Sequence, residues 1–488
     1  MLLKKLGAAT IIYGLGGVLN RGVSLLLLPL LTQFLDKKAY GVSGLLQIIS
    51  FFIIPIFSMG LGSSLSACYF KHSNEKDRQA SVMSAVLLMS ISAGILLLVC
   101  LPSAGWLAAN YLGDRKLSTV VEMAAITNAL ILVCQPLVLQ IQFADKSRIF
   151  VALSIITSLV TSAVIVVAVV NLKLGLAGWI GGQMVGQLIS LVVYGVYFLR
   201  HERGSIKWPV LRELVYMGIP LIPSFLFIYI ITQGNRYFIE RFWGVEELGV
   251  FSVASSIAAA VSLAVTAFQN AWTPFFMSYR NDINAARIVF GEVTSWYLLG
   301  MGVCAVAFFC FAQPIMALMT EQSFHSGWIV IGTVATAYIL TGATNLLAPA
   351  QYFSGKIWHL RIIQAIAAVC SVVINWLLIR SGGLLGAGSA LALSFLALFI
   401  IHAVWNHMDW SMSLPINYNW SRILTVWCAV FVVAVLTIYF PASSIGFGLA
   451  RGFALNFGFL VGMVILLSER ERTSIKSMIM GLLYRQRR

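Results

Sequence analysis

The sequence predicts an all-α protein that crosses a membrane many times. Apolar residues make up 60% of the 488 residues and charged residues only 10%, whereas about a quarter of the residues of soluble domains are charged. The mean hydropathy is +0.91, so the chain has too few charges to cover the surface of a soluble protein of this length. Runs of about 20 apolar residues, each long enough to cross roughly 30 Å of hydrocarbon, recur along the whole sequence.

These apolar runs predict about fourteen transmembrane helices joined by short connections. The first run follows Lys4 and Lys5, as a signal peptide would, but it is too long, holds Arg21 at its centre and leads directly into a second span. We therefore count it as a helix. In chain order the runs begin near Leu6, Gly41, Ser81, Thr119, Ile149, Leu176, Leu214, Leu248, Ile288, Gly327, Trp358, Leu384, Ile423 and Phe447.

The positions of the basic residues predict the orientation. With the N-terminus in the cytoplasm, 21 of the 32 Lys and Arg fall in inner segments, eight in outer loops and three within spans. Cytoplasmic loops carry such an excess, so an even number of spans with both termini cytoplasmic is expected. The same excess explains the net charge of +15 without a nucleic-acid partner.

An internal repeat predicts two lobes. A shift of 208 positions aligns Gln33–Val42 with Arg241–Val250 and Lys173–Gly178 with Ser381–Gly386. One offset at both ends of a six-helix unit indicates two parallel copies, with a binding site between them. The expected units are an N-terminal lobe, a C-terminal lobe, two additional helices and a basic cytoplasmic tail, over residues 1–207, 208–407, 408–468 and 469–488.

Four segments resemble a known transporter family. They are YGVSGLLQIISFF, LRELVYMGIPLIPSF, NRYFIERFWGVEELGVFSVASSIA and GKIWHLRIIQAIAAVCSVVINWLLIRSGGLLGAGSALALSF. The chain resembles, from end to end, the polysaccharide transporters (Wzx-type oligosaccharide flippases) of the multidrug/oligosaccharidyl-lipid/polysaccharide (MOP) superfamily. The resemblance implies a two-lobed fold like that of the multidrug extrusion (MATE) branch, with spans one, two, seven and eight lining a central cavity. It also implies transport of undecaprenyl-pyrophosphate-linked sugar repeat units across a bacterial inner membrane.

Arg21 is the first candidate for contact with such a substrate. A charge at the bilayer centre costs at least about 2.5–3.5 kcal/mol, so Arg21 should face protein or a water-filled cavity. Asn20 and Ser24 lie on the same polar stripe. A guanidinium binds two oxygens of a diphosphate with its planar fork. Alternatively, Arg21 bonds backbone carbonyls where two helices meet.

The seventh span carries a second polar stripe. Tyr229, Gln233 and Arg236 recur there at spacings of four and three, and Glu240 follows one turn later. Arg236 either contacts the substrate or pairs with Glu240.

Prolines and other polar residues complete the candidate set. Pro220 and Pro223 free backbone carbonyls in the seventh span, so they are hinge candidates. The other predicted cavity groups are Gln47 in the second span and Gln269, Asn270 and Trp272 late in the eighth. Trp272 is also a candidate for an interfacial aromatic belt.

Acidic residues discriminate between classes of transporter. Antiporters of cationic drugs need a carboxylate within the membrane to bind the cation or the coupling proton. Only Glu122, Glu240 and Glu292 approach span interiors, and these three are the candidates for ion coupling. The embedded charge is therefore mainly positive, which favours an anionic substrate.

The sequence lacks signals for an enzyme. It contains no G-x-x-x-x-G-K-[ST] loop, no HExxH and no Cys/His metal spacing, so we predict no catalytic residue, metal or cofactor. The longest outer loop, near residues 103–118, is too short for the catalytic loop of a sugar polymerase or ligase. The expected function is therefore flipping of lipid-linked oligosaccharide for O-antigen, capsule or exopolysaccharide by alternating access, alongside membrane lipid and a polymerase of the same pathway. The alternatives are an ion-coupled MATE-type antiporter and a lipid II flippase.

Overall fold

A computed structural model of the chain describes residues 2–466 apart from 73, 145, 202–203, 280–281, 356–357 and 408–417. The described residues form helices and no strands. Thirteen of these helices are long and apolar enough to cross a membrane. The longest, α16 (Trp358–His407), contains two spans because Gly383 interrupts it with φ 54° and ψ −131°. The predicted all-α class and the fourteen spans are confirmed, while the predicted tail 469–488 lies outside the described residues.

The first half of the chain forms six spans. Their helices are α1 (Leu2–Phe34), α2 (Lys37–Ser58), α3 (Leu61–Lys71), α4 (Glu75–Tyr111), the short η1 (Arg115–Leu117), α5 (Ser118–Phe143), α6 (Ser147–Val166), the π-helical turn η2 (Val167–Asn171) and α7 (Gly175–His201). The second span is divided into α2 and α3 because Met59 and Gly60 both have positive φ. Asp36 caps α2, since its carboxylate accepts a hydrogen bond from the amide of Ala39 (2.8 Å).

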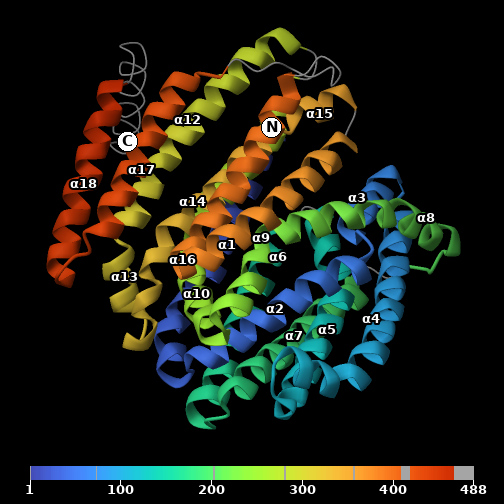
Figure 1. The fold of residues 1–488 in the computed structure, drawn as a ribbon. Helices are drawn as coiled ribbons and strands as arrows, with labels where there is room; N and C mark the ends of the chain where they lie inside the picture. Colours follow the sequence, from blue (N-terminus) through green and yellow to red (C-terminus); the bar gives the residue numbers. More distant parts are fainter. Residues whose placement is uncertain are drawn as a thin grey trace, which may run out of the picture.

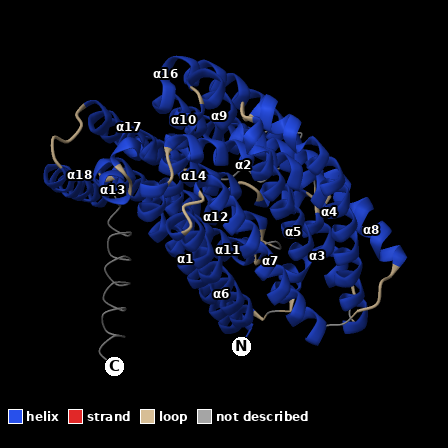
Figure 2. Ribbon diagram, turned by 90° about the horizontal axis from the view of Figure 1, so that it is seen from below, coloured by secondary structure: helices blue, strands red, loops and turns tan. Residues whose placement is uncertain are grey.

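The second half forms six further spans and two C-terminal helices. The elements are α8 (Trp208–Gly218), η3 (Ile219–Leu221), α9 (Ile222–Trp243), α10 (Val245–Ala258), η4 (Ala259–Val261), α11 (Ser262–Met277), α12 (Ile283–Cys310), α13 (Ala312–Met319), η5 (Gln322–Gly327), α14 (Trp328–Leu346), α15 (Pro349–Ser354), α16, α17 (Trp420–Tyr439) and α18 (Ile445–Leu466). Helices α17 and α18 pack against α12, at the opposite edge of the molecule from α8 (Figures 1 and 2).

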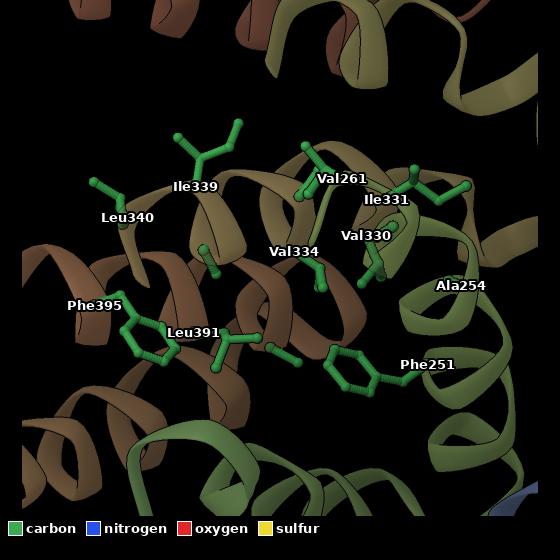
Figure 3. Close-up of a cluster of buried hydrophobic side chains, with 14 of the residues drawn as sticks. Phe251, Ala254, Val261, Val330, Ile331, Val334, Ile339, Leu340, Leu391 and Phe395 are labelled. Atoms are coloured by element: carbon green, nitrogen blue, oxygen red, sulfur yellow. The ribbon is translucent and has the colours of Figure 1, made fainter. Parts of the chain in front are cut away.

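Helices α2, α9 and α10 connect the two halves. Helix α2 packs against both α9 and α10, and α9 packs along α16. Figure 1 shows α9 and α10 between α2–α7 and α12–α16. Figure 3 shows the apolar core of the second half, a cluster to which Phe251 and Ala254 of α10, Val334 of α14, and Leu391 and Phe395 of α16 all contribute. In lipid, this close packing stabilises helix association through van der Waals contact.

Two glycines let α2 and α10 meet backbone to backbone. A β-carbon at Gly41 would lie 1.9 Å from the carbonyl oxygen of Val245, and one at Gly249 would lie 1.9 Å from that of Lys37. The two contacts are reciprocal, because Gly249 follows Gly41, and Val245 follows Lys37, by the same 208 positions. Both contacts lie at the end of the bundle where α2 and α10 begin, which we call the Lys37 end.

A second pair of positions with this offset shares a backbone conformation. Gly175, before α7, has φ +53°, and Gly383, within α16, has φ +54°. Each is followed three residues later by a glycine that abuts the preceding helix: a β-carbon would lie 2.9 Å from the Ala168 carbonyl at Gly178 and 2.0 Å from the Leu378 carbonyl at Gly386. The tight reversal of the chain therefore has the same form at both places.

Helix α8 is fastened to the first half of the chain, although α9 follows it directly. Lys71 of α3 pairs with Glu213 at 2.6 Å, and Asp77 of α4 pairs with Lys207, just before α8, at 2.5 Å. The helix then breaks into the 3-10 turn Ile219–Leu221, which contains Pro220. The two predicted hinge prolines thus lie where the chain passes from contacts with α3 and α4 to contacts with α16.

Candidate substrate cavity

A cavity of about 420 Å³ opens between α1, α2, α6 and α7, with α9 and α10 closing one side. This volume falls within the range of roughly 300–1,000 Å³ that is usual for small-molecule sites. The polar residues among those that line it are Asn20, Arg21, Ser24, Tyr40, Ser43, Gln47, Ser154, Thr157, Ser158, Thr161, Ser162, Trp179, Gln183, Ser190, Arg236, Ser252 and Ser256.

Two arginines from different halves of the chain share this cavity. Arg21 extends from the middle of α1 and Arg236 from α9. Arg236 donates to the hydroxyl of Ser252 at 3.2 Å. Within the described chain it makes no ion pair with Glu240, so the alternative pairing is not formed. The described residues that line the cavity include no Asp or Glu, so the charge of the two arginines is uncompensated among them.

Helix α6 supplies a wall of hydroxyl groups, which we call the α6 hydroxyl wall. Its five members are Ser154, Thr157, Ser158, Thr161 and Ser162. Their spacings of three and four residues place them on one helical face. The wall contacts α1 directly, because the Asn20 amide donates to the Ser154 hydroxyl at 3.1 Å. These five residues were not identified from the sequence, although their helical spacing could have indicated a polar face on this span.

The cavity is closed at the Lys37 end. The Tyr40 ring lies 4.8 Å from the Trp179 ring and 5.3 Å from that of Phe324 in η5, centroid to centroid. The amide of Glu321 also donates to the Thr32 hydroxyl of α1 at 3.3 Å. Together with the Gly41 and Gly249 contacts, these interactions hold the two halves together on this side.

Two of the predicted residues on α9 lie outside the cavity. Tyr229 packs against Phe51 of α2, with ring centroids 5.3 Å apart. Gln233 lines a separate apolar groove of about 500 Å³ between α2, α4, α9 and α16, where its side-chain oxygen has no partner in the described chain. Of the predicted stripe on α9, only Arg236 reaches the cavity.

The predicted residues on α11 also fall elsewhere. Gln269 is half-buried and Asn270 is exposed, and neither lines the cavity. Trp272 is only 4% exposed and packs in an aromatic cluster with Phe276 and Phe290. It therefore belongs to the core rather than to a belt or to the cavity. The helical spacing of Phe268, Trp272 and Phe276 places the three rings on one face. The first two meet α12 and Phe276 meets Phe353 of α15.

The three ion-coupling candidates do not line the cavity. Glu122 of α5 and Glu240 of α9 are half-buried, and Glu292 of α12 is exposed. Asn20, Arg21, Ser24, Gln47 and Arg236 are thus the predicted residues that the structure brings together.

The fold is that of a polytopic membrane protein, and a cavity lined by two arginines lies between its halves. The model for the family described as polysaccharide biosynthesis protein matches residues 6–280, and the chain belongs to this family. No curated protein matches the sequence.

Solved structures share the fold at low identity. A MATE protein in complex with MaD3S is similar at a TM-score of 0.62 and 14% identity, over 87% of this chain and 97% of that one. The lipid II flippase MurJ in an inward closed conformation is similar at a TM-score of 0.60 and 12% identity, over 94% of this chain and 98% of that one. A MOP-superfamily transporter from Pyrococcus furiosus is described as having a binding pocket of reversed polarity. It is similar at a TM-score of 0.56 and 11% identity, over 87% of this chain and 96% of that one. These likenesses establish a MOP-type fold.

Proposed function

We propose that the protein is a flippase for polyprenyl-diphosphate-linked oligosaccharide, in O-antigen, capsule or exopolysaccharide synthesis. The observation that carries the proposal is a cavity with Arg21 and Arg236 and no carboxylate among its lining residues. Guanidinium groups bind phosphate oxygens in a bidentate manner, and at low dielectric a dianionic headgroup neutralises both charges at once. The family description supports a sugar-linked cargo.

The cavity distinguishes this function from cationic drug efflux. An antiporter for cations needs an acidic group at its binding site. Two guanidinium groups in the cavity instead repel a cation. The three candidate carboxylates lie outside the cavity lining. A lipid II flippase would use the same headgroup chemistry, and the solved structure of such a protein shares the fold.

The proposed mechanism is alternating access between two lobes, residues 1–207 and 208–407. The reciprocal glycine contacts at an offset of 208 residues support this division. By the charge distribution the Lys37 end is the outer one, so the state described here is closed to the outside. We place the protein in the inner membrane of a bacterium with both termini cytoplasmic, where a polymerase of the same pathway would receive the sugars.

The junction between α8 and α9 is the proposed hinge, because α8 is held by the first lobe and α9 by the second. Replacing Pro220 and Pro223 together by alanine should straighten the junction, since proline disfavours a helix interior by about 3 kcal/mol. We expect transport to slow at least about tenfold while headgroup affinity is retained. Pro102→Ala, within α4, is the matched control. Unchanged transport in the double variant would remove the hinge role.

Reconstitution into liposomes tests the function itself. A polyprenyl-diphosphate oligosaccharide placed on one leaflet should become accessible to a glycosidase on the other side, whereas a cationic dye should not move. Dye efflux without sugar movement would contradict the proposal in favour of an antiporter. Preferential movement of lipid II would support the proposed binding of a diphosphate headgroup. It would contradict the proposal that the cargo is an oligosaccharide repeat unit.

A further inference from the structure

The polar groups of the cavity are of two chemical kinds, on different helices. Arg21 on α1 and Arg236 on α9 can only donate hydrogen bonds. The α6 hydroxyl wall instead offers oxygen atoms that accept as well as donate. A diphosphate has acceptors only, so it matches the arginines and leaves the acceptor lone pairs of the hydroxyl wall unused.

Part of the wall already has its protons engaged within the helix. The Thr157 hydroxyl donates to the Leu153 carbonyl at 3.0 Å, and the Thr161 hydroxyl donates to the Thr157 carbonyl at 2.7 Å. Their lone pairs remain available as acceptors on the cavity side. Ser158 and Ser162 have no hydrogen-bond partner among the described residues and keep both functions. The wall as a whole is thus ready to accept hydrogen bonds from a ligand.

Two further atoms in the cavity lack a partner. Tyr40 is 4% exposed, its ring is fixed between Trp179 and Phe324, and its hydroxyl makes no hydrogen bond within the described chain. The side-chain oxygen of Asn20 is likewise buried without a partner, although its amide is bonded to Ser154. Buried polar atoms are nearly always satisfied, by protein, water or ligand. The Asn20 oxygen can only accept, whereas the Tyr40 hydroxyl can donate or accept. A ligand that carries both hydrogen-bond donors and acceptors therefore satisfies the two atoms together.

We propose that the α6 hydroxyl wall, with Tyr40 and Asn20, binds the carbohydrate part of the substrate while the two arginines bind its diphosphate. The inference rests on the proposed function and assigns the residues that recognise sugar. Sugar hydroxyls both donate and accept, so they can satisfy Tyr40, Asn20, Ser158 and Ser162 together. A polyprenyl diphosphate without sugar has no hydrogen-bond donor for the oxygen atoms of these groups, and unmatched polar groups are a strong source of discrimination.

Two conservative variants test this assignment. Tyr40→Phe removes one hydroxyl and keeps the ring contacts, and Ser158→Ala combined with Ser162→Ala removes the two free hydroxyls of the wall. Binding is measured with the detergent-solubilised full chain for two probes, polyprenyl diphosphate bearing an oligosaccharide and bare polyprenyl diphosphate. Each lost hydrogen bond should weaken binding of the first probe about two- to tenfold and leave binding of the second unchanged. Ser90→Ala is the matched control, because Ser90 is exposed on α4 and bonds only its own helix (2.8 Å to the Val86 carbonyl).

The outcomes separate this inference from the proposed function. Unchanged affinity for the sugar-bearing probe, or equal losses for both probes, would overturn the hydroxyl assignment while leaving the flippase proposal intact. Wild-type protein that binds neither probe would overturn both. Melting temperatures of the variants, measured alongside, should match that of the wild type, since neither change removes a packing contact.

Discussion

Arg21→Ala and Arg236→Ala are each expected to abolish most transport by weakening headgroup binding about 10- to 150-fold. A hydrogen bond to a charged group contributes about 1.5–3 kcal/mol, and about 1.4 kcal/mol corresponds to a factor of ten in affinity. Arg21→Lys should recover only part of the loss, because lysine keeps the charge and lacks the planar fork. Binding of bare polyprenyl diphosphate to the solubilised protein, measured beside the liposome assay, reports both effects.

The stability of the empty protein separates this role from a structural one. Both guanidinium groups lie in the cavity without a lining carboxylate, so removing one relieves like-charge repulsion. The ligand-free variants should therefore melt no lower than the wild type. Arg361→Ala is the matched control, since Arg361 of α16 is half-buried outside the cavity. A variant at Arg21 that melts lower yet transports normally would support a role in helix contact instead.

Gly41→Ala and Gly249→Ala are expected to prevent closure at the Lys37 end. At either site the new β-carbon would lie 1.9 Å from a carbonyl oxygen, whereas ordinary contacts measure 3.4–4 Å. The obstructing atom is backbone on the partner helix, so the helices must separate by about 1.5–2 Å. Transport should then stop, because one of the two alternating states cannot form.

Spin labels at Lys38 and Glu246, exposed at the starts of α2 and α10, measure this opening directly. The distribution of distances should shift to longer values in both glycine variants, and the double variant should shift furthest. Gly300→Ala serves as the control, because its β-carbon would meet no atom within 4 Å. Distances like those of the wild type in a folded glycine variant would contradict the proposal that these two glycine contacts close the Lys37 end.

The spans and both cavity arginines could be predicted from sequence because the transfer of each between water and lipid involves a large free energy. Twenty apolar residues without charge have few alternatives to crossing a membrane. A charge such as Arg21 in mid-span must avoid lipid, so its approximate destination follows from its place in the sequence. The repeat aligned Gly175 with Gly383, and the structure adds that both have positive φ.

The remainder of the site depends on which face of each helix meets a neighbour. The hydroxyls of α6 carry little information in isolation, because serine and threonine in any membrane helix can bond their own backbone. Tyr40 looked like a residue of the motif following the first span, and only the packing of Trp179 and Phe324 fixes its ring at the cavity. Trp272 shows the converse error. An aromatic residue near a helix end suits a belt, a cavity or a core, and tertiary contacts alone select the core.

A structure of the protein with polyprenyl-diphosphate oligosaccharide bound tests the central claim most directly. We predict that the diphosphate lies between Arg21 and Arg236, within hydrogen-bond distance of both guanidinium groups, with the sugars toward α6. A diphosphate bound elsewhere, with both arginines unoccupied, would contradict the claim that this cavity carries the headgroup.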